Sequence, residues 1–367
     1  MEALNDVGAA EFLGVRTLTV SIYTTWLNQS SLAGAAQIAL FMLVLVLTPV
    51  EVERWARRRQ RHAAPRAGAL LRPRPLRGAR GWAVAGVVSL PVLCGFVLPA
   101  GYLVVEAVAR LRFAGIERHI LTETLNTVGF AAVTTVVATL IAFLLVSTLR
   151  QAGAAGAHGG SAGLARAPGT TVLVRLATVG YAVPGTVMGL GLLGPLGWFD
   201  AALDGFARGL FGVSTGLVLS ASGAALVYAY VARFLAVGSG AIEAGFARIA
   251  PRLDEAARSL GAPASRLAWR VHAPLALPAV AAAMLLVFVD CMKELPATLL
   301  LRPLNFETLA THLYGEAARG TYESGAIAAL LIVLTGLLPV VLLARVGDRV
   351  GGDGRAAGGA FGTEGNA

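Results

Sequence analysis

The sequence predicts an all-α integral membrane protein with about seven transmembrane helices. Of its 367 residues, 56% are hydrophobic and only 14% are charged, which is too few charged residues to cover a surface that faces water. Apolar runs of about 18 residues or more recur along the chain, and each is long enough to cross a bilayer as a helix. A soluble enzyme is therefore excluded.

The expected spans follow these apolar runs in order. They are residues 31–50, 82–108, 120–149, 171–196, 212–236, 274–292 and 324–344. Prolines lie inside them, including Pro91, Pro99, Pro184 and Pro195, which membrane bundles tolerate because neighbouring groups satisfy the freed carbonyls. In the fourth span, Gly185 and Gly189 form a face of small residues, and such a face allows another helix to approach closely.

The arginines predict the orientation. The stretch from Arg54 to Arg80 holds ten arginines and no acidic residue, so residues 51–81 are interpreted as an Arg-rich cytoplasmic linker. Alternation from this linker places the N-terminus in the periplasm and the C-terminus in the cytoplasm. The linker has almost no aromatic residues to stack on bases, so we expect it to contact anionic membrane lipid and not nucleic acid. The Gly/Ala-rich residues 346–367 are expected to form a disordered cytoplasmic tail.

An internal repeat relates the two ends of the chain. At an offset of 291 residues, Met1 aligns with Met292, Tyr23 with Tyr314, and Gly34-Ala35 with Gly325-Ala326. We interpret residues 1–50 as the C-terminal remnant of a first module, comprising a periplasmic segment and one span. Residues 82–345 form a complete second module, with its core at about 120–344.

The loop 242–275 carries a recognisable helical pattern and a sequence motif. From Ile242 to Leu260 the apolar residues fall on one helical stripe. The charged residues, including Asp254, Glu255 and Arg258, are expected to be exposed on the other faces. Gly261 suits the position just beyond a helix, where a positive φ is required. The pattern predicts a short amphipathic helix-turn-helix on the cytoplasmic side.

This loop resembles the EAA motif of ABC importer permeases, EAA-x3-G-x9-I-x-L-P. Here the motif is Glu255-Ala256-Ala257, three residues, Gly261, nine residues and Val271-His272-Ala273-Pro274, with Val in place of Ile and Ala in place of Leu. The resemblance implies the type I permease bundle and a helix that docks on a cytoplasmic ABC ATPase dimer. Glu255 would make a polar contact with the ATPase, Ala256 and Ala257 would allow close approach, Gly261 would make the turn, and Pro274 would open the next span.

A second resemblance concerns the cargo. Residues 293–303, KELPATLLLRP, are similar to a segment of ferric-iron ABC importer permeases, which are typically single chains of two fused modules. It implies a multi-pass protein of the bacterial inner membrane that imports ferric iron delivered by a periplasmic binding protein. Within the same class, thiamine, spermidine or putrescine, phosphonate and sulfate are the alternative cargoes. Asp290, as an acidic residue inside a span, and Lys293 and Glu294 beside it are candidates for the translocation path, although interfacial anchoring explains them as well.

The sequence contains no catalytic, cofactor-binding or metal-binding pattern. A phosphate-binding P-loop needs a Gly-Lys-Ser/Thr sequence, and the only lysine is Lys293. ATP is therefore expected to be used by a separate ATPase subunit, and the transport path needs a second permease module as a further partner. An intramembrane enzyme is the remaining alternative from another class, and it would require paired catalytic groups inside the spans.

Overall fold

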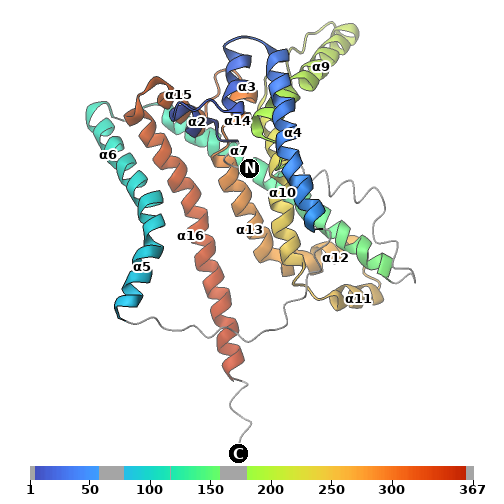
Figure 1. Ribbon diagram of the computed structural model, residues 1–367. Helices are drawn as coiled ribbons and strands as arrows, with labels where there is room; N and C mark the ends of the chain where they lie inside the picture. Colours follow the sequence, from blue (N-terminus) through green and yellow to red (C-terminus); the bar gives the residue numbers. More distant parts are fainter. Residues whose placement is uncertain (1–4, 58–77, 116, 158–179, 361–367) are drawn as a thin grey trace, which may run out of the picture.

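The fold is a bundle of membrane-spanning helices. The computed structural model describes residues 5–57, 78–115, 117–157 and 180–360, and every regular element in these ranges is helical. Seven of the helical segments described are long and apolar enough to cross a membrane. The predicted fold class and number of spans are confirmed (Figure 1).

Shorter helices cap both ends of the bundle. Figure 1 shows α2, α3, α14 and α15 gathered at one end and α11 and α12 at the other. The helices are α2 (Val7–Phe12), α3 (Leu18–Leu27), α4 (Leu32–Arg57), α5 (Ala79–Val92), η1 (Leu93–Val97), α6 (Leu98–Phe113), α7 (His119–Ala157), α9 (Gly185–Phe211), α10 (Gly223–Phe246), α11 (Pro251–Ser259), α12 (Ala264–Leu267), η2 (Ala268–His272), α13 (Ala273–Met292), α14 (Pro296–Leu301), α15 (Leu309–Arg319) and α16 (Tyr322–Ala360).

The centre of the bundle is formed by α7, α10 and α13, which pack against one another. Small residues bring these helices close together. A Cβ atom added at Gly245 of α10 would lie 2.2 Å from the Cβ of Ala279 on α13. The N-terminal helices join the same core, because Ile22 and Met42 are buried in one cluster with Leu226.

The predicted glycine face of α9 packs as expected. A Cβ atom at Gly189 would lie 3.0 Å from the side chain of Leu300 on α14. One at Gly185 would lie 3.2 Å from Pro296. The two glycines therefore seat α14 against α9.

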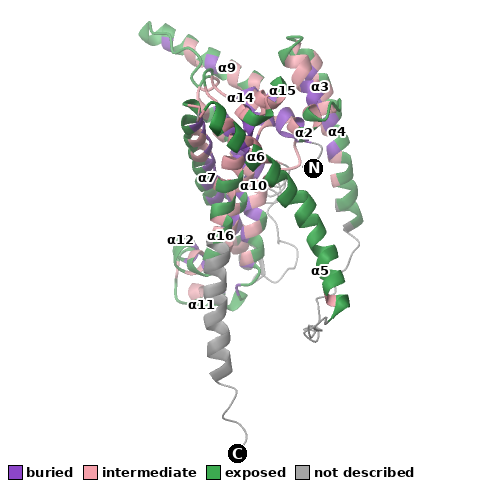
Figure 2. Cartoon of the chain, turned by 90° about the vertical axis from the view of Figure 1, so that its left-hand side faces the viewer, coloured by how far each residue is buried: buried purple, intermediate pink, exposed green. Residues whose placement is uncertain are grey.

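The segment α5–η1–α6 lies at the periphery, where it contacts α16. None of the apolar window in Ala79–Phe113 is buried inside the protein, and Figure 2 shows this helix exposed along its length. An apolar helix exposed all round is suited to lipid and not to water. Its surroundings are therefore the bilayer.

The boundaries of two expected spans differ in the structure. Residues 171–179 of the expected span 171–196 lie outside the described ranges, and α9 runs on to Phe211. The expected span 212–236 begins 11 residues later, at Gly223 of α10. Residues 212–222 do not form a helix because the Asp200 carboxylate accepts the backbone N–H groups of Leu219 and Ser220, both at 2.8 Å, and holds them in a turn.

Both ends of the Arg-rich linker and part of the tail are helical. α4 continues to Arg57 and α5 starts at Ala79, while residues 58–77 lie outside the described ranges. α16 continues to Ala360, so residues 346–360 are described as helix, while residues 361–367 of the expected disordered tail lie outside the described ranges. A helix that is already formed extends at little cost in free energy, because each added residue gains a backbone hydrogen bond. The composition of the tail describes it as an isolated segment and does not include this effect of the preceding helix.

The close approach of α10 to α13 leads to a stability prediction. In Gly245→Ala the new methyl group overlaps Ala279, and we expect the free energy of unfolding to fall by about 1–3 kcal/mol. Gly240→Ala is the matched control, because Gly240 lies on the same helix and a Cβ atom there meets nothing within 4 Å. The melting temperature in detergent should fall for Gly245→Ala only. Adding Ala279→Gly to Gly245→Ala should restore the melting temperature. Equal melting temperatures for both variants would contradict this packing.

Candidate functional site

The segment that carries the sequence motif forms a separate short helix, α11 (Pro251–Ser259). The expected stripe from Ile242 to Leu260 is not one helix, because α10 ends at Phe246. Pro251 explains the break. It has no N–H group, and inside a continuous helix its ring would clash with the carbonyl four residues earlier. At the first position of α11 neither problem arises.

Gly261 ends α11, as the sequence predicts. Its φ is +74°, a left-handed conformation that side chains with a Cβ atom enter poorly. The N–H of Gly261 donates to the carbonyl of Arg258 at 2.9 Å, and that of Ala262 donates to Ala257 at 3.0 Å. These two bonds form a Schellman motif, which turns the chain towards α12.

α11 departs from the expected pattern at Asp254, which was predicted to be exposed and is 2% exposed. Arg252 and Glu255 are exposed as predicted. On the apolar stripe, Leu253 and Leu260 are 45% and 85% exposed, so these two leucines face away from the protein. Ala256 is also exposed, while Ala257 is half-buried.

A half-buried arginine in the C-terminal part of α7 explains why Asp254 points inward. The Arg150 guanidinium donates from Nε to Asp254 Oδ2 at 2.6 Å, and its other two nitrogens donate to the carbonyls of Phe246 and Ile249 at 2.6 and 2.9 Å. Those carbonyls lie at and beyond the C-terminus of α10, and that of Phe246 also accepts the N–H of Ile249 at 3.0 Å. One side chain therefore ties α11 to both α7 and α10.

His272 of η2 completes this network. Its Nε2 lies 3.1 Å from Asp254 Oδ1, and its Nδ1 lies 3.2 Å from the hydroxyl of Ser147 on α7. Burial would raise the pKa of the Asp254 carboxyl, but the hydrogen bonds from Arg150 and His272 outweigh burial and lower that pKa below its usual value. We call Ser147, Arg150, Asp254 and His272 the inner polar network.

Pro274 lies one turn beyond this network, near the start of α13, and is exposed. α12, η2 and α13 form one continuous helical segment, Ala264–Met292. The span therefore begins ten residues before the predicted Pro274. The wider π turn of η2 directly before Pro274 accommodates the missing N–H and the bulk of the ring.

The second candidate group, Asp290, Lys293 and Glu294, lies at the other end of α13. Lys293 Nζ is 3.1 Å from Asp290 Oδ1. Glu294 is 5% exposed, and its Oε2 is 3.4 Å from Nε of the equally buried Arg233 in the middle of α10. Glu294 is thus more deeply buried than Asp290, which is 17% exposed. The sequence reading missed Arg233, because the expected span 212–236 placed it at the cytoplasmic edge.

Room for the Arg233–Glu294 pair comes from Gly185. A Cβ atom there would lie 2.4 Å from the guanidinium and 2.6 Å from the carboxylate. The Gly185 N–H donates to Asn5 Oδ1 at 2.7 Å, which connects the N-terminal segment to the pair. A cavity of about 310 Å³ adjoins these residues, and its lining includes Asn5, Asp6, Arg233, Asp290, Lys293 and Glu294. A polar cavity within an apolar bundle can admit an ion or a polar solute.

No group of three or more His, Cys, Asp or Glu side chains is placed to hold a metal ion among the residues that the structure describes. The arrangement instead offers two other features. One is an anchored helix with an outward apolar face, and the other is a polar cavity inside the bundle.

Comparison with known proteins agrees with this arrangement. The family described as "Binding-protein-dependent transport system inner membrane component" matches residues 158–350. The chain is 31% identical over 120 residues to an Fe(3+)-transport system permease protein of Haemophilus influenzae, and the match covers 33% of this chain and 24% of that protein. It is also 31% identical over 110 residues to a Salmonella typhimurium protein named as a 2-aminoethylphosphonate transport system permease, covering 30% of this chain and 42% of that protein.

A solved structure has the same fold. It is a chain of a bacterial alginate ABC transporter in complex with an alginate-bound periplasmic protein, with a TM-score of 0.52 and 14% identity. The alignment covers 74% of this chain and 96% of that one. The alignment therefore covers nearly the full length of that solved chain, whereas the chain spans only about a quarter to two fifths of the curated relatives.

The inner polar network leads to a prediction for α11. Asp254→Asn keeps the size of the side chain but removes the negative charge that faces Arg150, which should cost about 1–3 kcal/mol. We expect α11 to detach more often and trypsin to cut faster at Arg252 and Arg258. Glu255→Gln makes the same chemical change at the exposed neighbour and should leave cleavage unchanged. The cleavage rates are measured by mass spectrometry of the tryptic fragments. Identical rates for the two variants would show that the network does not hold α11.

Proposed function

The chain belongs to the family of binding-protein-dependent transport system inner membrane components, and on this basis we propose that it is the permease subunit of an ATP-driven importer of ferric iron. The observation that carries the proposal is α11, a helix fixed to the bundle by Arg150 while its apolar side chains face outward. The family consists of transport components, and catalysis by this chain forms no part of the proposal.

We propose that α11 docks in a groove of a cytoplasmic ABC ATPase dimer. Exposed leucines on a water-facing segment are unfavourable unless a partner covers them, and Leu253 and Leu260 are such residues. Glu255 supplies a polar contact beside them, and the small Ala256 and Ala257 permit close approach. ATP is bound by that partner.

This role for α11 sets the proposed orientation. The end of the bundle with α11 and α12 faces the cytoplasm, and the end with α2, α3, α14 and α15 faces the periplasm (Figure 1). The chain then starts at the periplasmic side, where a substrate-loaded binding protein docks, and ends in the cytoplasm. The arginines of the linker support the same orientation.

The inner polar network converts motion of α11 into motion of the spans. When the ATPase dimer closes, it pushes α11. Arg150 and Asp254 pass the displacement to α7 and α10, and His272 passes it to α13. Because buried charge-assisted hydrogen bonds are short and costly to break, these helices move with α11 as a unit. The path then alternates between outward-open and inward-open states.

The polar cavity beside Arg233 is proposed as part of the translocation path. Asp290, Lys293 and Glu294 line it, and their charges would replace part of the hydration of an ion in transit. Because acidic and basic groups are paired there, the cavity favours passage over tight binding. Tight binding of ferric iron is left to the periplasmic protein.

Ferric iron is the preferred cargo because residues 293–303 resemble ferric-iron permeases and a ferric-transport relative is 31% identical over 120 residues. A second candidate is 2-aminoethylphosphonate. The relative named for that compound is equally identical and is matched over a larger share of its length, 42%.

The docking role predicts the effect of changing Gly261. In Gly261→Val the backbone must leave its positive φ, at a cost of about 1–2 kcal/mol, and the end of α11 should no longer fit the ATPase. Gly212→Val is the matched control, because Gly212 has a φ of +67° beyond α9 and also has no atom near its Cβ position. The two glycine variants should lose similar amounts of stability, but only Gly261→Val should no longer co-purify with the ATPase. Glu255→Lys, which reverses a charge on α11, should also lose ATPase co-purification. If all three variants retain the ATPase, α11 is not the docking helix.

The cargo is tested with the assembled transporter in proteoliposomes. The complex of this chain, its ATPase and any second permease module is supplied with the binding protein, which is loaded in parallel with radioactive ferric iron or with 2-aminoethylphosphonate. We expect ATP-dependent accumulation of iron and none of the phosphonate. Accumulation of the phosphonate alone would transfer the assignment to the second candidate.

A further inference from the structure

Two helices near opposite ends of the chain, α3 and α15, are built alike. At the offset of 291 residues, α3 and α15 begin at equivalent positions, Leu18 and Leu309. Their N-caps, Thr17 and Thr308, each accept a hydrogen bond from the backbone N–H three residues on. The preceding turns also agree, since Gly14 has a φ of +67° and its equivalent Asn305 a φ of +60°. Matching starts, caps and turns indicate two copies of one unit, α2–α4 and α14–α16.

The two units meet at an equivalent pair of residues. The ring of Tyr23 packs against that of Tyr314, with centroids 5.7 Å apart and planes at 86°, and these tyrosines occupy the same position in the repeat. When two copies of a unit are related by a two-fold axis, a residue touches its own counterpart only beside that axis. The pair therefore marks an approximate two-fold axis between the units.

Opposite charges flank the tyrosine pair. Glu11 accepts a hydrogen bond from the hydroxyl of Tyr314. The residue equivalent to Glu11 is Arg302, which lines the same cavity as Tyr23 and forms an ion pair with Glu307. Equivalent positions thus carry charges of opposite sign beside the tyrosine pair.

A polar cavity of about 380 Å³ opens beside the pair. Both tyrosines line it together with charged residues from α7, α15 and the adjoining loops, namely Glu117, Glu123, Arg302, Glu307, Glu316 and Arg319. It lies at the end of the bundle with α3 and α15, opposite α11 (Figure 1). This is the end that the proposed orientation places in the periplasm.

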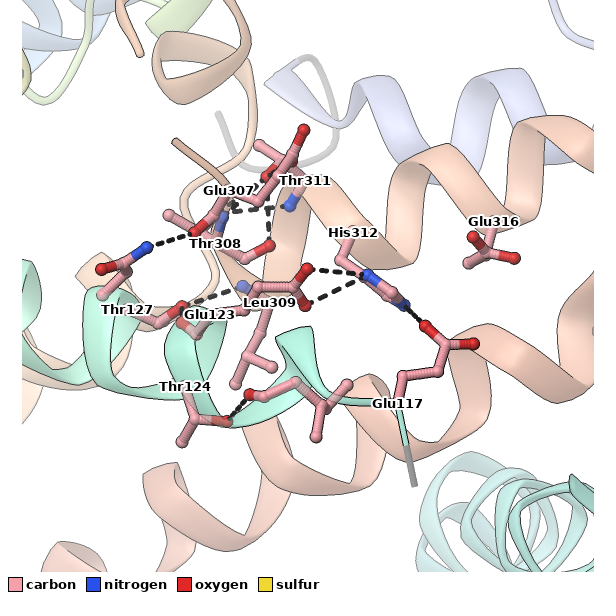
Figure 3. Close-up of polar contacts among 12 residues, drawn as sticks. Glu117, Glu123, Thr124, Thr127, Glu307, Thr308, Leu309, Thr311, His312 and Glu316 are labelled. Atoms are coloured by element: carbon pink, nitrogen blue, oxygen red, sulfur yellow. Dashed lines mark hydrogen bonds and ion pairs between the residues drawn. The ribbon is translucent and has the colours of Figure 1, made fainter. Parts of the chain in front are cut away.

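α15 is fixed to α7, so Tyr314 moves with the central bundle. Figure 3 shows the contacts that join the two helices. The N–H of Leu309 donates to the hydroxyl of Thr127 at 2.8 Å, and His312 Nδ1 lies 3.1 Å from the Glu123 carboxylate. The hydrogen bond with Glu123 raises the pKa of His312 against the effect of burial, and the charges of Glu117 and Glu316 add to this. Displacement of α7 is therefore transmitted to Tyr314.

We propose that Tyr23 and Tyr314 form the outer gate of the translocation path and that the 380 Å³ cavity is its mouth. The proposal rests on the proposed transport function. In the present structure the two rings meet and close the axis. Movement of α7 would draw α15 away from α3, separate the rings, and open the charged mouth to a hydrated ion.

The test measures the distance between the two positions in different states of the assembled transporter. The natural cysteines, Cys94 and Cys291, are replaced by alanine, and Tyr23→Cys and Tyr314→Cys are introduced together. The shortest bis-methanethiosulfonate cross-linker is applied to the nucleotide-free complex and to the complex trapped with vanadate and binding protein. We expect the cross-linking yield to fall about tenfold on trapping, as for a contact that exists in one of two states. The cross-link should also block stimulated ATP hydrolysis until it is reduced.

The control is a contact inside one module. Phe130 of α7 and Phe306, before α15, pack with centroids 4.8 Å apart, and the Phe130→Cys/Phe306→Cys variant should cross-link equally in both states. Equal yields for positions 23 and 314 in both states, or no cross-link in either, would overturn the gate. A complex whose ATP hydrolysis never responds to the binding protein, even without cross-linker, would instead contradict the proposed transport function.

Discussion

The interaction on which the rest of this structure depends is the buried contact between Arg150 and Asp254. The Arg150 guanidinium also donates to carbonyls at and beyond the end of α10, and its positive charge compensates the buried Asp254 carboxylate, which His272 contacts as well. Together these bonds fix the rotation of α11. That rotation in turn decides which residues of α11 meet solvent. With Asp254 held inward, Leu253, Glu255 and Leu260 remain exposed, and these are the residues proposed to meet the ATPase.

A second buried pair of opposite charges lies towards the other end of the bundle. Arg233 and Glu294 are both buried, and their pairing is possible only because Gly185 leaves space and Asn5 adds an acceptor. The N-terminal segment therefore contributes to a cavity that is otherwise made by α10 and the turn after α13. The aromatic contact between α3 and α15 ties the same two parts together nearer the end of the bundle. The Gly185–Asn5 and Tyr23–Tyr314 contacts bridge residues 180 and 291 positions apart in sequence, and in the present structure they join the N-terminal segment to the long module.

Most of the fold could be predicted from the sequence, because apolar runs determine spans and the turn glycine determines the end of α11. The faces of α11 could not be predicted. Periodicity identifies an apolar side but not whether its own chain or a partner covers it, and the decisive residue, Arg150, lies about a hundred positions away. Arg233 was missed for a related reason: hydropathy placed the span over 212–236, while carboxylates on α9 hold residues 212–222 in a turn. Long-range hydrogen bonds decided both points, and no local pattern encodes them.

The length of the peripheral helix has a consequence for the surrounding lipid. Ala79–Phe113 comprises 35 residues, which as a helix extend about 52 Å, whereas the hydrocarbon core of a bilayer is about 30 Å thick. Such a helix must tilt strongly or project beyond the headgroups. Because it contacts the bundle chiefly along α16, its tilt can change with little loss of packing. Membranes of different thickness would thus be accommodated at this edge of the protein, leaving the central helices undisturbed.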